Sequence, residues 1–465
     1  MSAEPATGEP AAEWRSSADL FGHPKGLTFL FGTEMWERFS YYGMRAVLVL
    51  YMVKYLLLPG QAEGVVGLAT LRAALEWVLG PLGPQPLASQ IYGLYTGFVY
   101  LTPIIGGLVA DRLLGQRRTV IIGAALMAAG HFMMAFEGLF LLALFTLILA
   151  NGAFKPNIST QVGSLYAPGD HRRDRAYSIF YVGINLGGFM APLVCGTLGE
   201  KVGWHYAFGA AGIGMLFGLV IYLYGQRHLP PDPRERIAAA RREARPLDRE
   251  DWRAIAVLLA LFVPVSFFWA TYEQQGNTIV LWADGFTDRS LDLLFWQGEI
   301  PTTWFQSFNP FLIFAFTPLV VSLWARQARK GSEPSTISKM ALGCLGVAIA
   351  NLILAFAAWQ AGGDGGKAGW LWLFAYFVII TVGELYISPI GLSLVSKIAP
   401  ASILSLLMGL WLATSFAGNL LAGWLGGFWS AMGKSEFFLM IALIALVASA
   451  AIRLLAGPLK SALDQ

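Results

Sequence analysis

The chain has 465 residues, of which 56% are hydrophobic and only 13% charged, and its mean hydropathy is +0.57. Soluble domains carry about 25% charged residues, so this composition excludes a soluble globular protein and indicates an integral membrane protein. The net charge of +3 points to no particular partner, and Cys195 and Cys344, both within apolar stretches, exclude a disulfide framework or a cysteine metal cluster.

Residues 1–26 are polar and lack the apolar core of a cleavable signal peptide, so we expect a cytosolic N-terminal tail. A polar segment at 228–252 divides the rest into an N-terminal bundle (27–227) and a C-terminal bundle (253–457), and a second cytosolic tail follows at 458–465. Windows of about 20 apolar residues predict six membrane-spanning helices in each bundle. The twelve predicted spans are 27–57, 88–111, 119–136, 139–163, 174–199, 204–227, 253–283, 309–329, 338–361, 368–398, 402–430 and 436–457.

Lysine and arginine predict the orientation, because they gather on the cytosolic side of membrane proteins. With the N-terminus in the cytosol, 23 of the 32 Lys and Arg residues lie in inner segments and 5 in outer ones. We therefore expect a multi-pass protein of the cell membrane with both termini cytosolic. The arginine-rich linker at 228–252 is expected to form a short helix on the membrane surface. The outer loops at 58–87 and 284–308 are expected to form short interfacial helices.

The first span contains the most informative pattern. Glu34, Arg38, Tyr41 and Arg45 are spaced by 4, 3 and 4 residues, so they share one helical stripe, and Glu37 lies beside it. Each ionisable group facing lipid costs on the order of 2.5–3.5 kcal/mol. The stripe is therefore expected to line a polar cavity in a protein that moves or binds a charged molecule.

Depth along the helices predicts which intramembrane charges meet. At about 1.5 Å of rise per residue, Glu37 lies about 15 Å from the inner end of its span and Lys155 about 12 Å from the inner end of its own. A pair between Lys155 and Glu34 or Glu37, beside Arg38, is therefore feasible. Arg45 and Glu273 lie about 27 and 30 Å from the inner side, so they are expected to join the two halves near the outside. A buried structural ion pair without a transport role is the alternative for each.

Several aromatic and amide residues at similar depths suit a pocket for variable side chains, since Trp and Tyr combine an apolar ring with a polar group. Glu384 lies about 21 Å above the inner end of its span, close to the middle of the membrane. Each of the others is equally compatible with core packing. The candidate pocket residues besides Arg38, Arg45 and Lys155 are Tyr41, Tyr100, Asn185, Trp269, Asn309, Glu384, Trp411 and Ser415.

The segment between the second and third predicted spans contains Gly107, Asp111, Arg112, Gly115 and Arg117 in the pattern G-x-x-x-D-R-x-x-G-x-[RK]-[RK]. This resembles the loop signature of the major facilitator superfamily. An acid at a helix end beside a tight basic turn is suited to latching one bundle to the other on the cytosolic side, and simple charge anchoring is the alternative.

The first span indicates a narrower family, because residues 34–43 resemble the E-x-x-E-R-F-x-Y-Y-G signature of the proton-dependent oligopeptide transporter family. Residues 151–157 (NGAFKPN), 180–187 (FYVGINLG) and 383–391 (GELYISPIG) resemble that family in the same order. One departure is that many bacterial members insert two extra helices between the halves, and the 228–252 linker is too short for them.

The resemblance implies an all-α integral membrane protein with the major facilitator superfamily fold, a symporter that imports di- and tripeptides with protons by alternating access. It implies no enzymatic activity, no cofactor or metal besides the coupling proton, no nucleic acid, and a monomer in the lipid bilayer. It suggests that Arg38 and Lys155 bind the peptide carboxylate and Glu384 the amino group.

Proton coupling is expected to follow from competition for positive charge. A peptide carboxylate would displace Glu34 or Glu37 from Arg38 and Lys155, and the displaced glutamate would favour protonation. Protonation of Glu273 would likewise release Arg45. The alternatives that remain are a proton-coupled carrier of another small solute or drug in the same superfamily, and a non-transporting peptide sensor.

Overall fold

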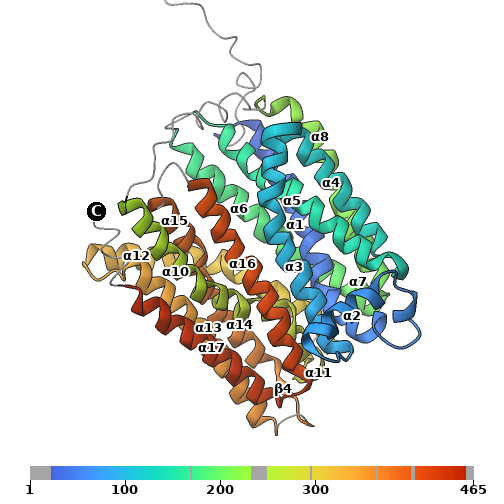
Figure 1. Cartoon of the computed structure of the whole chain (residues 1–465). Coiled ribbons are helices and arrows are strands. Elements are labelled where there is room, and N and C mark those ends of the chain that lie inside the picture. The colour runs from blue at the N-terminus through green and yellow to red at the C-terminus, as the bar shows by residue number, and fades with distance from the viewer. Residues whose placement is uncertain are drawn as a thin grey trace, which may run out of the picture.

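The structure, a computed structural model, consists of two bundles of long helices, blue to green and yellow to red in Figure 1. It describes residues 22–167, 170–231, 249–293, 296–362, 365–398 and 404–456. The predicted surface helix in the linker falls largely on 232–248, outside the described residues, as do residues 1–21 and 457–465 of the two predicted tails.

The first bundle is built from the apolar segments that the sequence predicts as spans. Two of its helices, α1 and α3, continue into a wider π-helical turn, and α6 runs through such a turn into α7. The elements are α1 (Lys25–Tyr51), η2 (Met52–Leu56), η3 (Ala62–Gly64), α2 (Leu68–Leu79), α3 (Pro84–Val109), η4 (Ala110–Leu114), α4 (Gln116–Met133), η5 (Glu137–Leu139), α5 (Phe140–Ser164), α6 (Arg172–Ala191), η6 (Pro192–Gly196), α7 (Thr197–Lys201), α8 (Trp204–Gly225) and η7 (Gln226–His228).

The second bundle begins at Arg249, four residues before the predicted start of its first span. Its elements are α10 (Arg249–Tyr272), η9 (Glu273–Gly276), α11 (Thr278–Gly285), β1 (Thr287–Asp288), β2 (Ser290–Leu293), β3 (Trp296–Glu299), η10 (Thr302–Ser307), α12 (Phe308–Arg329), α13 (Thr336–Gln360), β4 (Ala368–Gly369), α14 (Trp370–Leu385), α15 (Ser388–Ile398), α16 (Leu404–Gly426), η12 (Gly427–Ser430) and α17 (Lys434–Leu454).

Nine helical segments of the described residues are long and apolar enough to cross a membrane. The predicted spans at 27–57, 119–136 and 402–430 correspond to α1, α4 and α16, which are not among these nine. In α1 the ionisable side chains lower the mean hydropathy, and these are the side chains on which the prediction of a polar cavity rests. The count of twelve spans therefore stays a prediction.

The two long outer loops differ from each other. Residues 58–87 contain the expected amphipathic helix, α2, whose Trp77 is 88% exposed. Residues 284–308 contain the short helix η10, as predicted for this loop, and also an antiparallel hairpin of β2 and β3 that was not predicted. Apolar and polar residues alternate from Ser290 to Leu293, and this period of two favours a strand.

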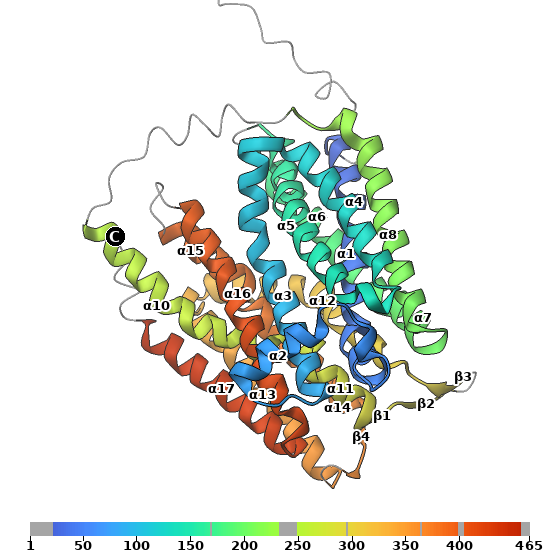
Figure 2. The ribbon, with the colours of Figure 1, turned by 45° about the vertical axis from the view of Figure 1, so that its right-hand side comes forward.

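The bundles converge at the end that carries α2 and α11, and they diverge toward the end that carries α15 and the start of α10 (Figure 2). Helix α3 packs along α16, and α6 packs against α12. At the converging end the α3 and α16 backbones nearly touch, because a Cβ placed on Gly93 would lie 2.7 Å from Cα of Gly423. We call the converging end the outer side and the end with the 228–252 linker the inner side.

Candidate functional site

Arg38 is the centre of a buried charge cluster on α1. Its Nη2 donates to Oε1 of Glu37 at 2.7 Å, and its Nε donates to the other oxygen of the same carboxylate. Oε1 of Glu34, one helical turn earlier, lies 3.3 Å from the same Nε. The three side chains are at most 4% exposed, and the guanidinium carbon lies 5.1 Å from the ring of Tyr41 and 5.9 Å from that of Tyr42. The guanidinium of Arg38 thus contacts two carboxylates and lies near two aromatic rings.

Lys155 on α5 contributes a second cation to this region. Its ammonium lies 4.9 Å from the centre of the Tyr100 ring on α3, and it interacts electrostatically with Glu34, Glu37 and Arg38. Among the residues that the structure describes, however, no carboxylate lies within ion-pair distance of Lys155. The predicted direct pair with Glu34 or Glu37 is therefore not formed, because Arg38 occupies both carboxylates. Oε2 of Glu34 is buried, and within the described part of the chain it accepts no hydrogen bond.

A second ion pair joins the two halves. Nη2 of Arg45 on α1 donates to Oε2 of Glu273, the first residue of η9. The side chains are 13% and 3% exposed, and Nε of Arg45 donates to the hydroxyl of Tyr92 at 2.8 Å. The contact that depth predicted between Arg45 and Glu273 is present. Tyr92 was missed, because nothing in its apolar helix distinguishes it from a packing residue.

Glu384 is the carboxylate that the second half presents at mid-membrane. It lies in the last turn of α14 and accepts a hydrogen bond of 2.9 Å from Nδ2 of Asn309 on α12. The same amide nitrogen donates to Oγ1 of Thr381 at 3.1 Å. Asn309 therefore orients Glu384. The ring of Tyr42 lies 5.9 Å from the guanidinium carbon of Arg38, and its hydroxyl interacts electrostatically with Glu384.

The other candidate pocket residues have mixed surroundings. Nε1 of Trp269 is buried and has no hydrogen-bond partner among the described residues. Asn185 donates to the carbonyl of Tyr181 in its own helix at 2.9 Å. Trp411 is 4% exposed and packs against Gly391, where an added Cβ would lie 2.0 Å from the indole. Ser415, 5% exposed, lies in α16 one turn further on. The packing of Trp411 matches the alternative of core packing, and the free donor of Trp269 suits a ligand.

The loop motif between α3 and α4 holds the linker. Gly115 adopts a φ of 82°, which glycine favours, and this turn ends η4. Nη2 of Arg117 donates to the carbonyl oxygens of Leu229 and, at 2.9 Å, Pro230. Asp111 lies in η4 and Arg112 is exposed, while Gly107 has open space around it. Arg117 therefore contacts the start of the linker.

A second set of contacts between the halves closes the outer side, and it was not predicted from the sequence. The carboxylate of Glu200 in α7 accepts hydrogen bonds from the backbone N–H groups of Thr302 and Thr303 at 2.9 and 2.8 Å. It also accepts a hydrogen bond of 2.7 Å from Oγ1 of Thr303. Nearby, Lys54 pairs with Asp284 at 2.5 Å. We call the contact of Glu200 with Thr302 and Thr303 the outer latch.

Comparisons with known proteins agree with this architecture. The model of the POT family matches residues 117–241 and 235–440. The peptide transporter YePEPT of Yersinia enterocolitica subsp. palearctica is 34% identical over 88% of both chains, and a di-/tripeptide transporter of Lactococcus lactis subsp. cremoris is 32% identical over 96% of this chain and 97% of its own.

Solved structures lead to the same family. A mutant of the peptide transporter POT in complex with alafosfalin has a TM-score of 0.81 at 30% identity, covering 98% of this chain and 99% of its own. A POT family transporter in complex with 5-aminolevulinic acid has a TM-score of 0.79 at 27% identity, covering 95% and 98%. The family resemblance and the predicted fold class are confirmed.

Proposed function

The chain belongs to the POT family of transporters, and from this premise we propose that it imports di- and tripeptides together with protons. The relatives named as peptide transporters support the substrate class. The proton is supported by the family and by carboxylates buried beside cations in the membrane. The proposal includes twelve spans in two bundles of six, both termini in the cytosol of a bacterial cell, and a monomer.

The placement of opposite charges on the two halves carries the substrate assignment. Lys155 and Arg38 belong to the first half, and Glu384, held by Asn309, belongs to the second. A short peptide is a zwitterion, so its carboxylate suits the cations and its amino group suits Glu384. Tyr42 interacts electrostatically with both Arg38 and Glu384, which supports one ligand bridging the two halves.

The ion pairs suggest an order of events. Arg38 already pairs with Glu37 and Glu34, whereas Lys155 has no carboxylate partner among the described residues. Lys155 is therefore the first cation available to the peptide carboxylate. A second carboxylate then competes for Arg38, and a glutamate that loses this cation in a low-dielectric site takes up a proton. Proton uptake and peptide binding become linked through Arg38.

The pair of Arg45 with Glu273 links protonation to alternating access. It crosses from one half to the other near the outer side, so a neutral Glu273 would release Arg45 and loosen the closed outer side. Arg45 retains the Tyr92 hydroxyl as a partner in that state. The halves would then rock about the site between them.

The decisive experiment uses liposomes that are acidic outside and negative inside, with labelled dialanine. A membrane potential of about 100 mV contributes about 2.3 kcal/mol per proton, which allows roughly fifty-fold accumulation. We expect concentrative uptake that a protonophore abolishes and that Glu37→Gln abolishes as well. Competition by dialanine with its amine acetylated or its carboxylate amidated tests the two ends separately. If acetylated and amidated dialanine compete for uptake as well as unmodified dialanine does, the charge assignment is contradicted.

A second candidate substrate class is a small amino-acid-like zwitterion without a peptide bond. It is favoured by the solved relative in complex with 5-aminolevulinic acid, which also carries an amine and a carboxylate. Labelled 5-aminolevulinic acid in the same liposomes distinguishes the classes. Uptake of this compound without uptake or competition by dialanine would replace the peptide assignment. Specific binding of dialanine without any uptake would favour a peptide sensor.

A further inference from the structure

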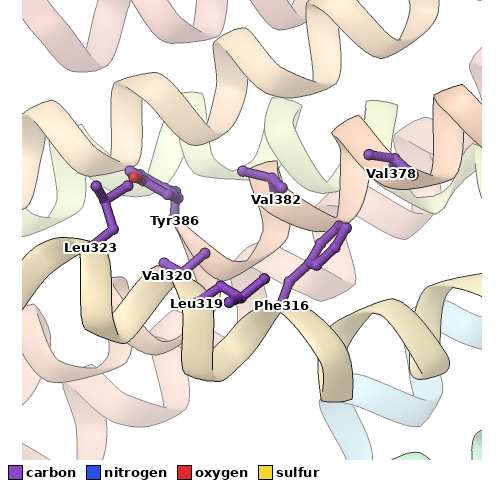
Figure 3. A pocket seen from close by; sticks show the side chains of 7 residues that line it. All are labelled: Phe316, Leu319, Val320, Leu323, Val378, Val382 and Tyr386. Atoms are coloured by element: carbon purple, nitrogen blue, oxygen red, sulfur yellow. The ribbon is translucent and has the colours of Figure 1, made fainter.

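An apolar groove runs between α12 and α14 (Figure 3). Its volume is about 290 Å³, and α12 lines it with Phe316, Leu319, Val320 and Leu323. Helix α14 contributes Val378 and Val382, and Tyr386 lies directly after its last residue. Leu319 is 64% exposed and Leu323 is 45% exposed. These side chains therefore form an open surface groove rather than a closed core.

The groove faces lipid. Both helices belong to membrane-spanning segments. Val382 and Glu384 are two residues apart, which places them about 200° from each other around α14. Because Glu384 points to Asn309 in the candidate site, the Val382 face points away from that site. A hydrocarbon chain is the apolar molecule present at this depth of the membrane.

Two cations continue the same stripe of α12 at the inner side. Leu319, Leu323, Arg326 and Lys330 follow one another at intervals of 4, 3 and 4 residues, so they share a face. Arg326 and Lys330 are exposed, and among the described residues neither has a carboxylate within ion-pair distance. Phe316 lies about 15 Å from Arg326 along the helix, which is half of the hydrocarbon thickness of about 30 Å and thus the depth of one leaflet.

We propose that this groove binds an anionic phospholipid of the inner leaflet. One acyl chain lies along Leu323, Leu319 and Phe316, and the headgroup phosphate contacts Arg326 and Lys330. The apolar lining, its length and the two unpaired cations at its end match the two parts of such a lipid. The inference uses the orientation given by the positive-inside pattern, and it holds whichever solute the protein transports.

The test is native mass spectrometry of the purified full chain, titrated with dioleoyl phosphatidylglycerol or with dioleoyl phosphatidylcholine. The two lipids have the same chains, so their difference isolates the headgroup. We expect the first lipid that binds to bind more tightly when it is phosphatidylglycerol than when it is phosphatidylcholine. The double variant Arg326→Gln/Lys330→Gln should weaken it about thirtyfold, as expected for two cations near an anionic headgroup. Leu319→Trp, at an exposed position, should weaken it by filling the groove.

The matched control is Arg118→Gln/Arg253→Gln. These two arginines are exposed on the same side of the membrane. Arg118 is on α4, which packs against α5 and α8, and Arg253 is on α10, which packs against α16 and α17. We expect the control to bind phosphatidylglycerol like the wild type. If both double variants lose phosphatidylglycerol binding equally, the effect comes from general surface charge and the proposal is overturned. Undiminished binding in Leu319→Trp, or equal binding of both lipids by the wild type, would overturn it too.

Discussion

The outer latch makes the sharpest prediction about alternating access. Pro301 precedes η10 and supplies no side-chain cap, so the first N–H groups of η10 are capped by Glu200 from the opposite half. Glu200→Ala removes all three hydrogen bonds to Thr302 and Thr303, whereas Glu200→Gln keeps acceptor capacity but loses the charge. Both substitutions are expected to favour the outward-open state, and the alanine variant more strongly.

The magnitude follows from the contacts. A hydrogen bond to a charged group contributes about 1.5–3 kcal/mol, but Glu200 is only partly buried, and water replaces the lost partners when the latch opens. A net change of about 3 kcal/mol for the alanine variant is therefore expected, which shifts the ratio of outward-closed to outward-open protein about a hundredfold. A shift of that size is large enough to populate a state that is otherwise rare.

Distances between spin labels measure this ratio. Val202→Cys and Gln360→Cys place labels at exposed outer positions on the two halves, and the native cysteines are buried. We expect a longer distance to gain population in Glu200→Ala, and a smaller gain in Glu200→Gln. The matched control is Glu299→Gln, an outer glutamate that is 63% exposed. An unchanged distance distribution in a well-folded Glu200→Ala would refute the reasoning that the latch holds the outer side closed.

Glu273→Gln is expected to abolish proton-driven accumulation but to preserve peptide counterflow, because a neutral side chain cannot carry the proton. The substitution also removes one partner of the buried ion pair with Arg45, a loss that costs about 3–5 kcal/mol. Accumulation that survives would remove Glu273 from coupling. Lys155→Gln should weaken dialanine binding about tenfold or more, with little effect on amidated dialanine, as measured by competition; equal effects on both would place the carboxylate elsewhere. Gly93→Val should lower the thermal unfolding temperature, since overpacking costs about 1–3 kcal/mol and an added Cβ would lie 2.7 Å from the α16 backbone. Gly209→Val should not lower this temperature, because an added Cβ there meets no atom within 4 Å. Equal decreases of the unfolding temperature in both variants would contradict overpacking as the cause.

The sequence was sufficient for the features that depend on position along a helix. The stripe on α1 and the contact of Arg45 with Glu273 both followed from residue spacing and rise per residue. The direct pair of Lys155 with a glutamate did not form, because depth along a helix says nothing about which of two cations wins. Arg38 wins through its planar fork, which binds Glu37 with two hydrogen bonds although adjacent helical residues do not normally face each other.

Features that depend on the meeting of distant segments were out of reach. Glu200 directly follows the predicted span 174–199, and nothing in the sequence indicates its partner, which lies 102 residues later in the chain. The hairpin of β2 and β3 was missed because its alternation covers only four residues on each side of the turn, too short to outweigh the amphipathic interpretation of the loop. The contact of Glu200 requires knowledge of how the two bundles face each other, whereas the hairpin is local and was missed because its signal is short.

The contact of Gly93 with Gly423 also has a mechanical consequence. An added Cβ at Gly93 would lie 2.7 Å from α16, whereas one at Gly409, nearer the inner side, would lie 3.6 Å from Ile104 on α3. The distance between α3 and α16 therefore increases from the outer contact toward the inner side. The end of α3 lies about 24 Å from Gly93, so each degree of rotation about that contact moves the inner end by about 0.4 Å. A rotation of about ten degrees then displaces the inner end by roughly 4 Å, close to the width of a side chain, while the outer contact hardly moves.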